Sequence, residues 1–250
     1  MTHRISIVSY LNSVPFIYGI KNHTIYKNLD LSLHIPSVSV KKFLNNEMDI
    51  GLVPVAAINK LQNFNIFSNY CIGSNGKVDT VCVFSDTPIY DVDEILIDYH
   101  SITSVKLLKL LLKDYYNINP NLKKTTDGFE KKISKSQAAL VIGDKAFNLH
   151  KKHKYVYDLS EAWFKMTGLP FVFACWIAKE EINQNILNEI NSSFLYGINN
   201  IDCALKTNSF NNIDYRRVEF YLKNRICYKF DNKKKKAMAI FLEKITDLQL

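Results

Sequence analysis

The sequence has little arginine and no long apolar run. Only four of its 32 basic residues are arginine, at positions 4, 216, 217 and 225, and lysine is a poor substitute where bases or phosphates must be clamped. We therefore expect no nucleic-acid partner. No window approaches the roughly 18 consecutive apolar residues of a membrane span, and the N-terminus lacks the charged, apolar and small residues that mark a secretory leader in series. We expect a cytoplasmic protein with no membrane partner.

Cysteine, glycine and histidine are too few or too scattered for several kinds of site. The five cysteines are an odd number and form no CxxC pair, so neither a disulfide framework nor a zinc site is indicated. The eight glycines form neither GxGxxG nor GxxxxGK, which are the phosphate-binding loops. Neither an HExxH arrangement nor a GxSxG elbow is present. We predict no metal and no cofactor.

The apolar pattern predicts an α/β protein. At 250 residues and 47% hydrophobic content, the chain can bury a substantial core. Period-2 or continuous apolar segments predict strands over residues 5–10, 31–35, 50–55, 80–85, 94–99, 138–142 and 169–177. Helical periodicity predicts helices over residues 38–45, 105–115, 145–153, 182–198, 218–226 and 237–248. After residue 177 we expect helices alone.

Two predicted strands, near Ser85 and near Phe173, are expected to carry the chain from one lobe to another. We therefore predict a discontinuous first lobe of residues 1–85 plus 175–250, covered by the final helices, and an inserted second lobe of residues 86–174. A cleft between such lobes is the natural ligand site. The sequence leaves the oligomeric state open.

Small polar residues follow three of the predicted strands. The junctions contain Tyr10, Asn12 and Ser13, then Ser101, Thr103 and Ser104, then Gly143 and Asp144. A helix N-terminus offers unpaired N–H donors and a partial positive charge, so it binds a carboxylate without arginine. Two such places suit a small dicarboxylic acid. The ordinary alternative is that these residues only cap helices, because Ser, Thr, Asn and Asp are the common N-cap residues.

The junctions, together with two further motifs, resemble one protein family in order and spacing. The motifs are residues 9–16, 49–54, 101–105, 139–144 and 163–174. They are similar to the chorismate dehydratase family of the futalosine route to menaquinone. The resemblance implies a two-lobed type 2 periplasmic-binding-protein fold with a ligand cleft between the lobes. It also implies a carbon–oxygen lyase that removes water from chorismate to give 3-[(1-carboxyvinyl)oxy]benzoate.

The resemblance further implies roles for individual residues. Asn12 is the expected catalytic residue, which positions the enolpyruvyl carboxylate of the substrate or hydrogen-bonds the leaving hydroxyl. The expected substrate-binding residues are Tyr10, Ser13, Thr80, Ser101, Thr103, Ser104, Gly143, Asp144, Leu169 and Pro170. The chain departs from the family pattern at Thr80, where serine is usual, and at Ile102, where a basic residue is common. The change at Ile102 makes carboxylate binding depend more on backbone donors.

The identity of the general base stays open among three candidates. The junctions offer no histidine or glutamate that matches a family motif, which leaves Asp144, Asn12 or the enolpyruvyl carboxylate of the substrate itself. We favour the substrate carboxylate and interpret Asp144 as a helix cap.

Two other functions fit the same architecture. A non-enzymatic protein that binds small carboxylates is one, but such proteins usually carry an export signal. The other is 1,4-dihydroxy-6-naphthoate synthase of the same pathway, which we expect to need an evident base such as a histidine in the second lobe. The motif over residues 167–173 favours the dehydratase over this sibling enzyme.

Overall fold

The computed structural model describes residues 2–97, 101–126, 128–134, 136–208, 210 and 213–246. The chain divides into two compact units. Unit 1 consists of Met1–Gly73 and Val172–Asn232, and unit 2 consists of Ser74–Phe171 and Lys233–Leu250. The chain therefore passes between the units at three places, where the sequence predicted two.

In unit 1 the described residues form a six-stranded sheet with the order β11-β4-β10-β3-β1-β2. Its strands are β1 (His3–Val8), β2 (Leu29–His34), β3 (Ile50–Pro54), β4 (Phe64–Ser74), β10 (Phe171–Lys179) and β11 (Cys227–Lys229). Strand β1 runs parallel to β2 and β3, and β10 runs antiparallel to β3. Strand β3 is buried along its whole length, as the continuous apolar run predicts for a strand covered on both faces.

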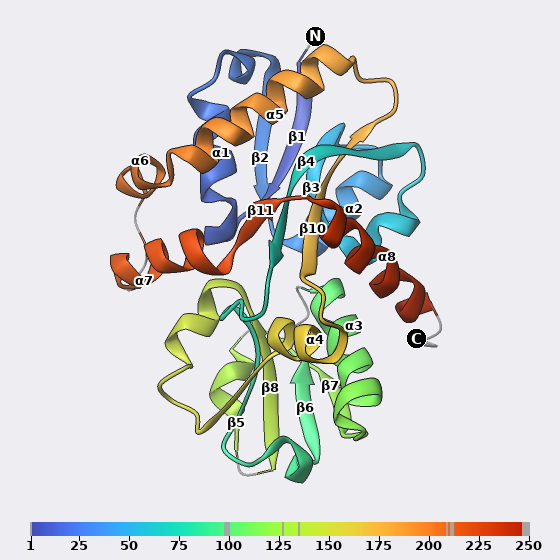
Figure 1. The fold of residues 1–250 in the computed structure, drawn as a ribbon, viewed down its shortest axis with the longest axis vertical. Coiled ribbons are helices and arrows are strands. Elements are labelled where there is room, and N and C mark those ends of the chain that lie inside the picture. Colours follow the sequence, from blue (N-terminus) through green and yellow to red (C-terminus); the bar gives the residue numbers. More distant parts are fainter. Residues whose placement is uncertain are drawn as a thin grey trace. The chain divides into compact units, whose positions relative to one another are not determined.

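Helices α1 (Val14–Lys21) and α5 (Gln184–Asn199) pack against each other beside this sheet (Figure 1). Glycines permit the close crossing, because a β-carbon at Gly19 would overlap the carbonyl of Ser193 and one at Gly197 would overlap the carbonyl of Pro15. The other helical segments of unit 1 are α2 (Pro36–Leu44), α6 (Ile201–Lys206), α7 (Tyr215–Phe220), η1 (Leu11–Ser13), η2 (Thr24–Asn28), η3 (Val55–Lys60) and η8 (Tyr221–Arg225).

Aromatic rings fill the core between α1, α5 and the sheet. The ring centroid of Phe16 lies 5.3 Å from Trp176 and 4.8 Å from Phe194, and Trp176 stacks on Phe194 at 4.2 Å. All three side chains are fully buried. Edge-to-face contacts of this kind add to the stabilisation that burial provides, so the start of α1 rests on a dense part of the core.

In unit 2 the described residues form a five-stranded sheet with the order β7-β6-β8-β5-β9. Its strands are β5 (Val81–Ser85), β6 (Glu94–Ile97), β7 (Asn121–Lys124), β8 (Gln137–Ile142) and β9 (Tyr155–Asp158). Its helical segments are α3 (Ile102–Leu111), α4 (Leu159–Thr167), α8 (Asn232–Thr246), η4 (Ile89–Asp91), η5 (Leu112–Tyr116), η6 (Phe129–Lys132) and η7 (Gly143–Asn148).

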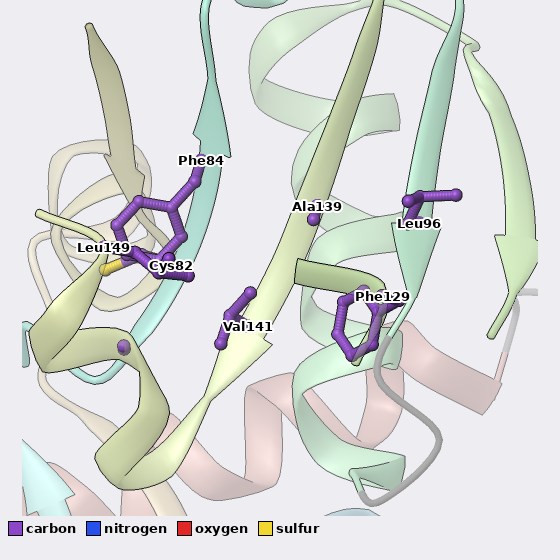
Figure 2. Packing of buried hydrophobic residues seen from close by; sticks show 8 residues of the cluster. Cys82, Phe84, Leu96, Phe129, Ala139, Val141 and Leu149 are labelled. Atoms are coloured by element: carbon purple, nitrogen blue, oxygen red, sulfur yellow. The ribbon is translucent and has the colours of Figure 1, made fainter. Parts of the chain in front are cut away.

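Cross-strand rows build the core of unit 2. Ala139 of β8 lies opposite Phe84 of β5 on one side and Leu96 of β6 on the other, and Cys82 lies opposite Val141. Figure 2 shows these side chains together with Phe129 and Leu149, which pack over the same cluster. Directly opposed side chains are the unit of sheet stabilisation, so the ladder between β5 and β8 is the centre of this unit.

The boundaries of the two units differ from those expected for the two lobes. Residues 81–85 pair within unit 2, where Val81 lies opposite Ile142, although the first lobe was expected to end at residue 85. Helix α8 packs in unit 2, because the ring of Phe241 lies 4.9 Å from Phe171 and 6.0 Å from Trp163. An apolar helix face looks the same in the sequence whichever unit it covers, so the pattern does not reveal this packing.

The structure differs from the sequence prediction at β11 and over residues 145–153. Strand β11 follows residue 177, where we expected helices alone, because three residues are too few to give a period-2 pattern. The predicted helix over residues 145–153 is the short 3-10 helix η7, which ends at Asn148. The predicted end of the strand over 94–99 falls partly on residues outside the described part. No helix in the described residues is both long and apolar enough to cross a membrane.

Candidate functional site

The first group of candidate residues lies at the carboxyl end of β1 in unit 1. Tyr10 precedes η1 with an extended backbone (φ −108°, ψ 160°), and its carbonyl accepts the N–H of Ser13 at 2.9 Å. Ser13 is fully buried and makes no side-chain cap to α1. Instead its hydroxyl donates to Oδ1 of Asn12 at 3.4 Å. The structure thus brings these three residues together, with Ser13 directed to the Asn12 amide.

The main chain of Asn12 is held by a residue far along the sequence. The hydroxyl of Tyr228 in β11 donates to the carbonyl oxygen of Asn12 at 3.1 Å, although 216 residues separate the two. Tyr228 is almost fully buried, and burial raises the pKa of its phenol well above the usual value. The hydroxyl therefore keeps its proton and stays a donor. This residue could not be predicted from the sequence, since one aromatic in an apolar segment looks like ordinary core.

One histidine, His34, lies near this junction. It ends β2 opposite Val8, and its carbonyl accepts the N–H of Ser9 at 3.0 Å. Its ring Nδ1 lies 3.0 Å from the Ser6 hydroxyl, and burial lowers the pKa of the imidazole. The ring therefore faces Ser6 and not the junction, so its orientation does not favour a role as the base at Asn12.

The second group lies in unit 2, where β8 ends and β5 begins. The N–H of Gly143 donates to the carbonyl of Thr80 at 2.8 Å. Gly143 has φ 68°, a backbone conformation that glycine adopts without strain. Thr80 is 2% exposed. Asp144 lies in the first turn of η7, whose N-cap is Ile142, so our interpretation of Asp144 as the cap is wrong.

Asp158 anchors the segment that leads into Thr80. Its carboxylate accepts four backbone N–H groups, from Val78 at 2.9 Å, Asp79 at 2.7 Å, Ser160 at 3.0 Å and Glu161 at 3.1 Å. Burial raises the pKa of this carboxyl, and the N–H donors oppose that rise. Asp158 was not among the residues predicted from the sequence, although an acidic residue three positions before a glutamate is a capping pattern that marks a helix start.

His150 and His153 also have structural partners in unit 2. Nε2 of His150 lies 2.6 Å from the carbonyl oxygen of Asp79, which fixes it as a donor there. Nδ1 of His153 lies 3.0 Å from Oδ1 of Asp86. These contacts tie loops of unit 2 together and engage Nε2 of His150 and Nδ1 of His153 with structural partners.

The third group lies at the N-terminus of α3. Ser101 is the N-cap, and its hydroxyl oxygen accepts the N–H of Ser104 at 3.0 Å. Thr103 and Ser104 are 2% and 3% exposed in the first turn. Strands β6 and β8 are parallel, with Ile97 opposite Leu140, so α3 and η7 begin at the same edge of the sheet. Ser101 thus caps α3, and the binding role of these three residues stays a prediction.

The last two candidates, Leu169 and Pro170, follow the end of α4. Gly168 closes that helix with φ 68°, which is the common glycine helix end. The N–H of Leu169 donates to the Thr167 hydroxyl at 3.2 Å, and Trp163 Nε1 donates to the carbonyl of Pro170 at 3.1 Å. These contacts explain the motif as a fixed helix end. The binding role of Leu169 and Pro170 stays a prediction.

Comparison with known proteins gives one family match over almost the whole chain. A family model described as menaquinone biosynthesis matches residues 3–247. The chain belongs to this menaquinone biosynthesis family. Membership confirms the family to which the sequence motifs pointed.

Two named relatives of the chain are chorismate dehydratases. The one from Campylobacter jejuni is 28% identical over an alignment of 255 positions, gaps included, which covers 97% of this chain and 97% of that protein. The one from Thermus thermophilus is 28% identical over 165 residues, which cover 59% of this chain and 60% of that protein. The first alignment shows that the likeness extends to the C-terminal segment.

Solved structures confirm the fold. A protein from Archaeoglobus fulgidus aligns with a TM-score of 0.80 at 14% identity and covers 98% of this chain and 97% of its own. A Candida albicans protein described as having the generic periplasmic-binding-protein fold aligns with a TM-score of 0.67 at 12% identity, over 99% and 90% of the two chains. The predicted α/β periplasmic-binding-protein-like fold is therefore correct.

Proposed function

We propose that the chain is a chorismate dehydratase, a carbon–oxygen lyase that converts chorismate to 3-[(1-carboxyvinyl)oxy]benzoate and water. The observation that carries this proposal is the alignment with the Campylobacter jejuni chorismate dehydratase over 97% of both chains. The match to the menaquinone biosynthesis family over residues 3–247 supports the same conclusion.

The chemistry calls for hydrogen-bond donors more than for a strong base. Chorismate loses the proton on carbon 3 and the hydroxyl on carbon 4, and the ring becomes aromatic. The ring alkene conjugated to the carboxylate acidifies that proton, so negative charge builds up on the ring carboxylate. Fixed donors at this carboxylate stabilise the transition state.

We assign the ring carboxylate to the N-terminus of α3. The first turn of this helix offers backbone N–H groups and the buried Thr103 and Ser104, and the helix dipole favours an anion there. Ser101 already accepts the N–H of Ser104, so its proposed contribution is to fix the turn and to donate its own hydroxyl proton. Ile102 adds no charge, which leaves binding to these neutral donors.

We assign the enolpyruvyl carboxylate to Asn12. The Ser13 hydroxyl donates to the Asn12 amide oxygen, which favours an orientation in which the amide N–H₂ donates to the substrate. In this proposal the enolpyruvyl carboxylate takes the carbon 3 proton, and Asn12 holds it in place. Correct placement of reacting groups supplies several kcal/mol of the barrier reduction, so a positioned neutral amide is sufficient.

The remaining proposed substrate contacts are Tyr10, Thr80, Gly143, Asp144, Leu169 and Pro170. We further propose that the enzyme works in the cytoplasm, without metal or cofactor. None of the five cysteines, all of which lie in the described residues, forms a disulfide, and three of them are buried, which fits a reducing compartment.

The test is to mix the purified protein with chorismate, without metal or cofactor, and to follow the product by chromatography and mass spectrometry. The expected product is lighter than chorismate by one water. If chorismate stabilises the protein against heat but is not converted, a binding protein replaces this proposal. If there is no conversion and no stabilisation, cyclic futalosine becomes the substrate to test, because the sibling enzyme uses it.

A further inference from the structure

Strand β11 has an irregularity at Tyr228. Cys227 lies opposite Gly73 of β4, whereas Lys229 lies opposite Tyr70, so two steps along β11 correspond to three along β4. A bulge of this kind bends the strand that carries the extra residue, here β4, and leaves one residue of β11 opposite it. Tyr228 is the residue at that position, and its side chain is almost fully buried.

The buried side chain of Tyr228 makes two contacts that serve different purposes. Its ring lies edge-on to Phe16 of α1, with centroids 5.3 Å apart, which is ordinary core packing that phenylalanine would reproduce. Its hydroxyl donates to the carbonyl oxygen of Asn12 at 3.1 Å. The hydroxyl is therefore the part of this side chain that packing alone does not require.

Tyr228 and Ser13 hold Asn12 at two points. Tyr228 bonds its main-chain carbonyl, and Ser13 bonds its side-chain Oδ1. Asn12 lies in the three-residue helix η1, between the end of β1 and the start of α1, where few regular backbone hydrogen bonds are available to hold it. A residue so placed depends on such contacts for its orientation.

We infer that Tyr228 is a positioning residue for the dehydration, which acts by fixing the main chain of Asn12 and so the direction of its amide. The inference rests on the proposed function. It places a determinant of turnover in a three-residue strand near the C-terminal end of unit 1, outside every motif that carried the family resemblance.

The test compares Tyr228→Phe with Tyr70→Phe as the matched control. Both variants remove one phenolic oxygen, and position 70 lies on β4 opposite Lys229, beside the same bulge. We expect Tyr228→Phe to lower kcat about tenfold or more, since small misplacements of a catalytic group cost that much. KM should change less than about twofold and the melting temperature should match that of the control. Turnover equal to the control would overturn the inference.

A double-mutant cycle separates positioning from general structure. If Tyr228 acts through Asn12, then Tyr228→Phe has no further effect on kcat in an Asn12→Ala background. A merely structural role would lower kcat by the same factor in both backgrounds, and that result would overturn the inference.

A readout independent of turnover distinguishes the inference from the proposed function. In a ¹⁵N-labelled protein, Tyr228→Phe should shift the side-chain amide resonances of Asn12, and Tyr70→Phe should leave them unchanged. If the wild type fails to convert chorismate, the proposed function fails. If the Asn12 resonances also stay in place in Tyr228→Phe, the positioning contact itself is disproved.

Discussion

Gly197 in α5 lies directly against the carbonyl group of Pro15 in α1, so closely that a β-carbon at position 197 would overlap it. Pro15 is the second residue of α1, three residues after Asn12. The crossing of these two helices therefore constrains the position of the first turn of α1, where the junction after β1 ends. A contact that looks like core packing thus bears on the proposed site.

We predict that Gly197→Ala destabilises the protein. Alanine favours a helix over glycine by up to about 1 kcal/mol, but the added methyl group must separate α1 from α5, and overpacking costs about 1–3 kcal/mol. Urea unfolding measures the difference. Ser192→Ala, at an exposed position on the same helix, is the control and should change the unfolding free energy by less than about 0.5 kcal/mol. Equal stability of the two variants would show that the helices separate at no cost.

Asn12→Ala should abolish most turnover while leaving the fold intact. The side chain is half-buried and its proposed role is to hold the enolpyruvyl carboxylate, so we expect kcat to fall about a hundredfold. Steady-state kinetics with chorismate, alongside thermal unfolding, measure this. A variant with full turnover would remove Asn12 from the mechanism.

Thr103→Val tests the N-terminus of α3. The substitution keeps the shape of the side chain and leaves a carboxylate oxygen of the substrate without its donor, at a cost of about 1–3 kcal/mol. We expect a higher KM and a lower kcat. If neither constant changes, Thr103 does not contact the substrate and its burial serves packing alone.

Asp158→Asn should loosen the segment before Thr80. An asparagine keeps one acceptor oxygen and turns an N–H₂ group toward backbone N–H donors, so some of the four bonds are lost. Breaking a buried network of this kind lowers the unfolding free energy by about 3 kcal/mol. Asp214→Asn is the control, because it changes an exposed helix cap where both residues serve equally well. Equal effects of the two substitutions would contradict the anchoring role of Asp158.

Asp49→Asn should weaken the protein most at neutral pH and less in acid. Nη2 and Nε of Arg4 lie 2.6 and 3.0 Å from the carboxylate and Nζ of Lys179 lies 3.0 Å from it, and the Arg4 hydrogen bond above all holds the pKa of Asp49 well below its usual range. A depressed carboxyl pKa contributes stability above the unfolded pKa of about 3.9, and this is lost as the pH falls further.

The measurement for Asp49 is urea unfolding of wild type and Asp49→Asn between pH 7 and pH 3. The difference should be about 2 kcal/mol at pH 7, stay constant down to about pH 5 and shrink below pH 4. Asp30→Asn, at an exposed position, is the control with little difference throughout. A gap that persists unchanged at pH 3 would show that charge is not its origin.

The sequence predicts those parts of the fold that repeat a simple period. Strand β3, predicted over residues 50–55, ends at Pro54. Ser101, predicted to precede a helix, is the N-cap of α3. The bounds of the units were harder, because β5 and the last helix carry ordinary apolar patterns that do not reveal their partners. Short elements such as β11 have too few residues to show a period at all.

The candidate site likewise contains residues that the sequence could predict and residues that it could not. The residues at strand ends could be located, because polar groups that follow an apolar strand stand out. Tyr228 could not be found, since its role depends on a contact with Asn12, which lies 216 positions earlier in the chain. Asp158 could have been predicted, because its spacing to Glu161 matches a capping pattern.

The packing of α8 in unit 2 affects when this unit can complete its core during synthesis. Phe241 packs against Trp163 and Phe171, so unit 2 has all of its sequence up to Phe171 long before the ring that completes this cluster is synthesised. A ribosome must first produce the whole second segment of unit 1. Since domains tend to fold as they emerge, unit 2 must begin to fold while Trp163 and Phe171 lack the ring that packs on them, and a chain that ends before residue 241 would lack this contact altogether.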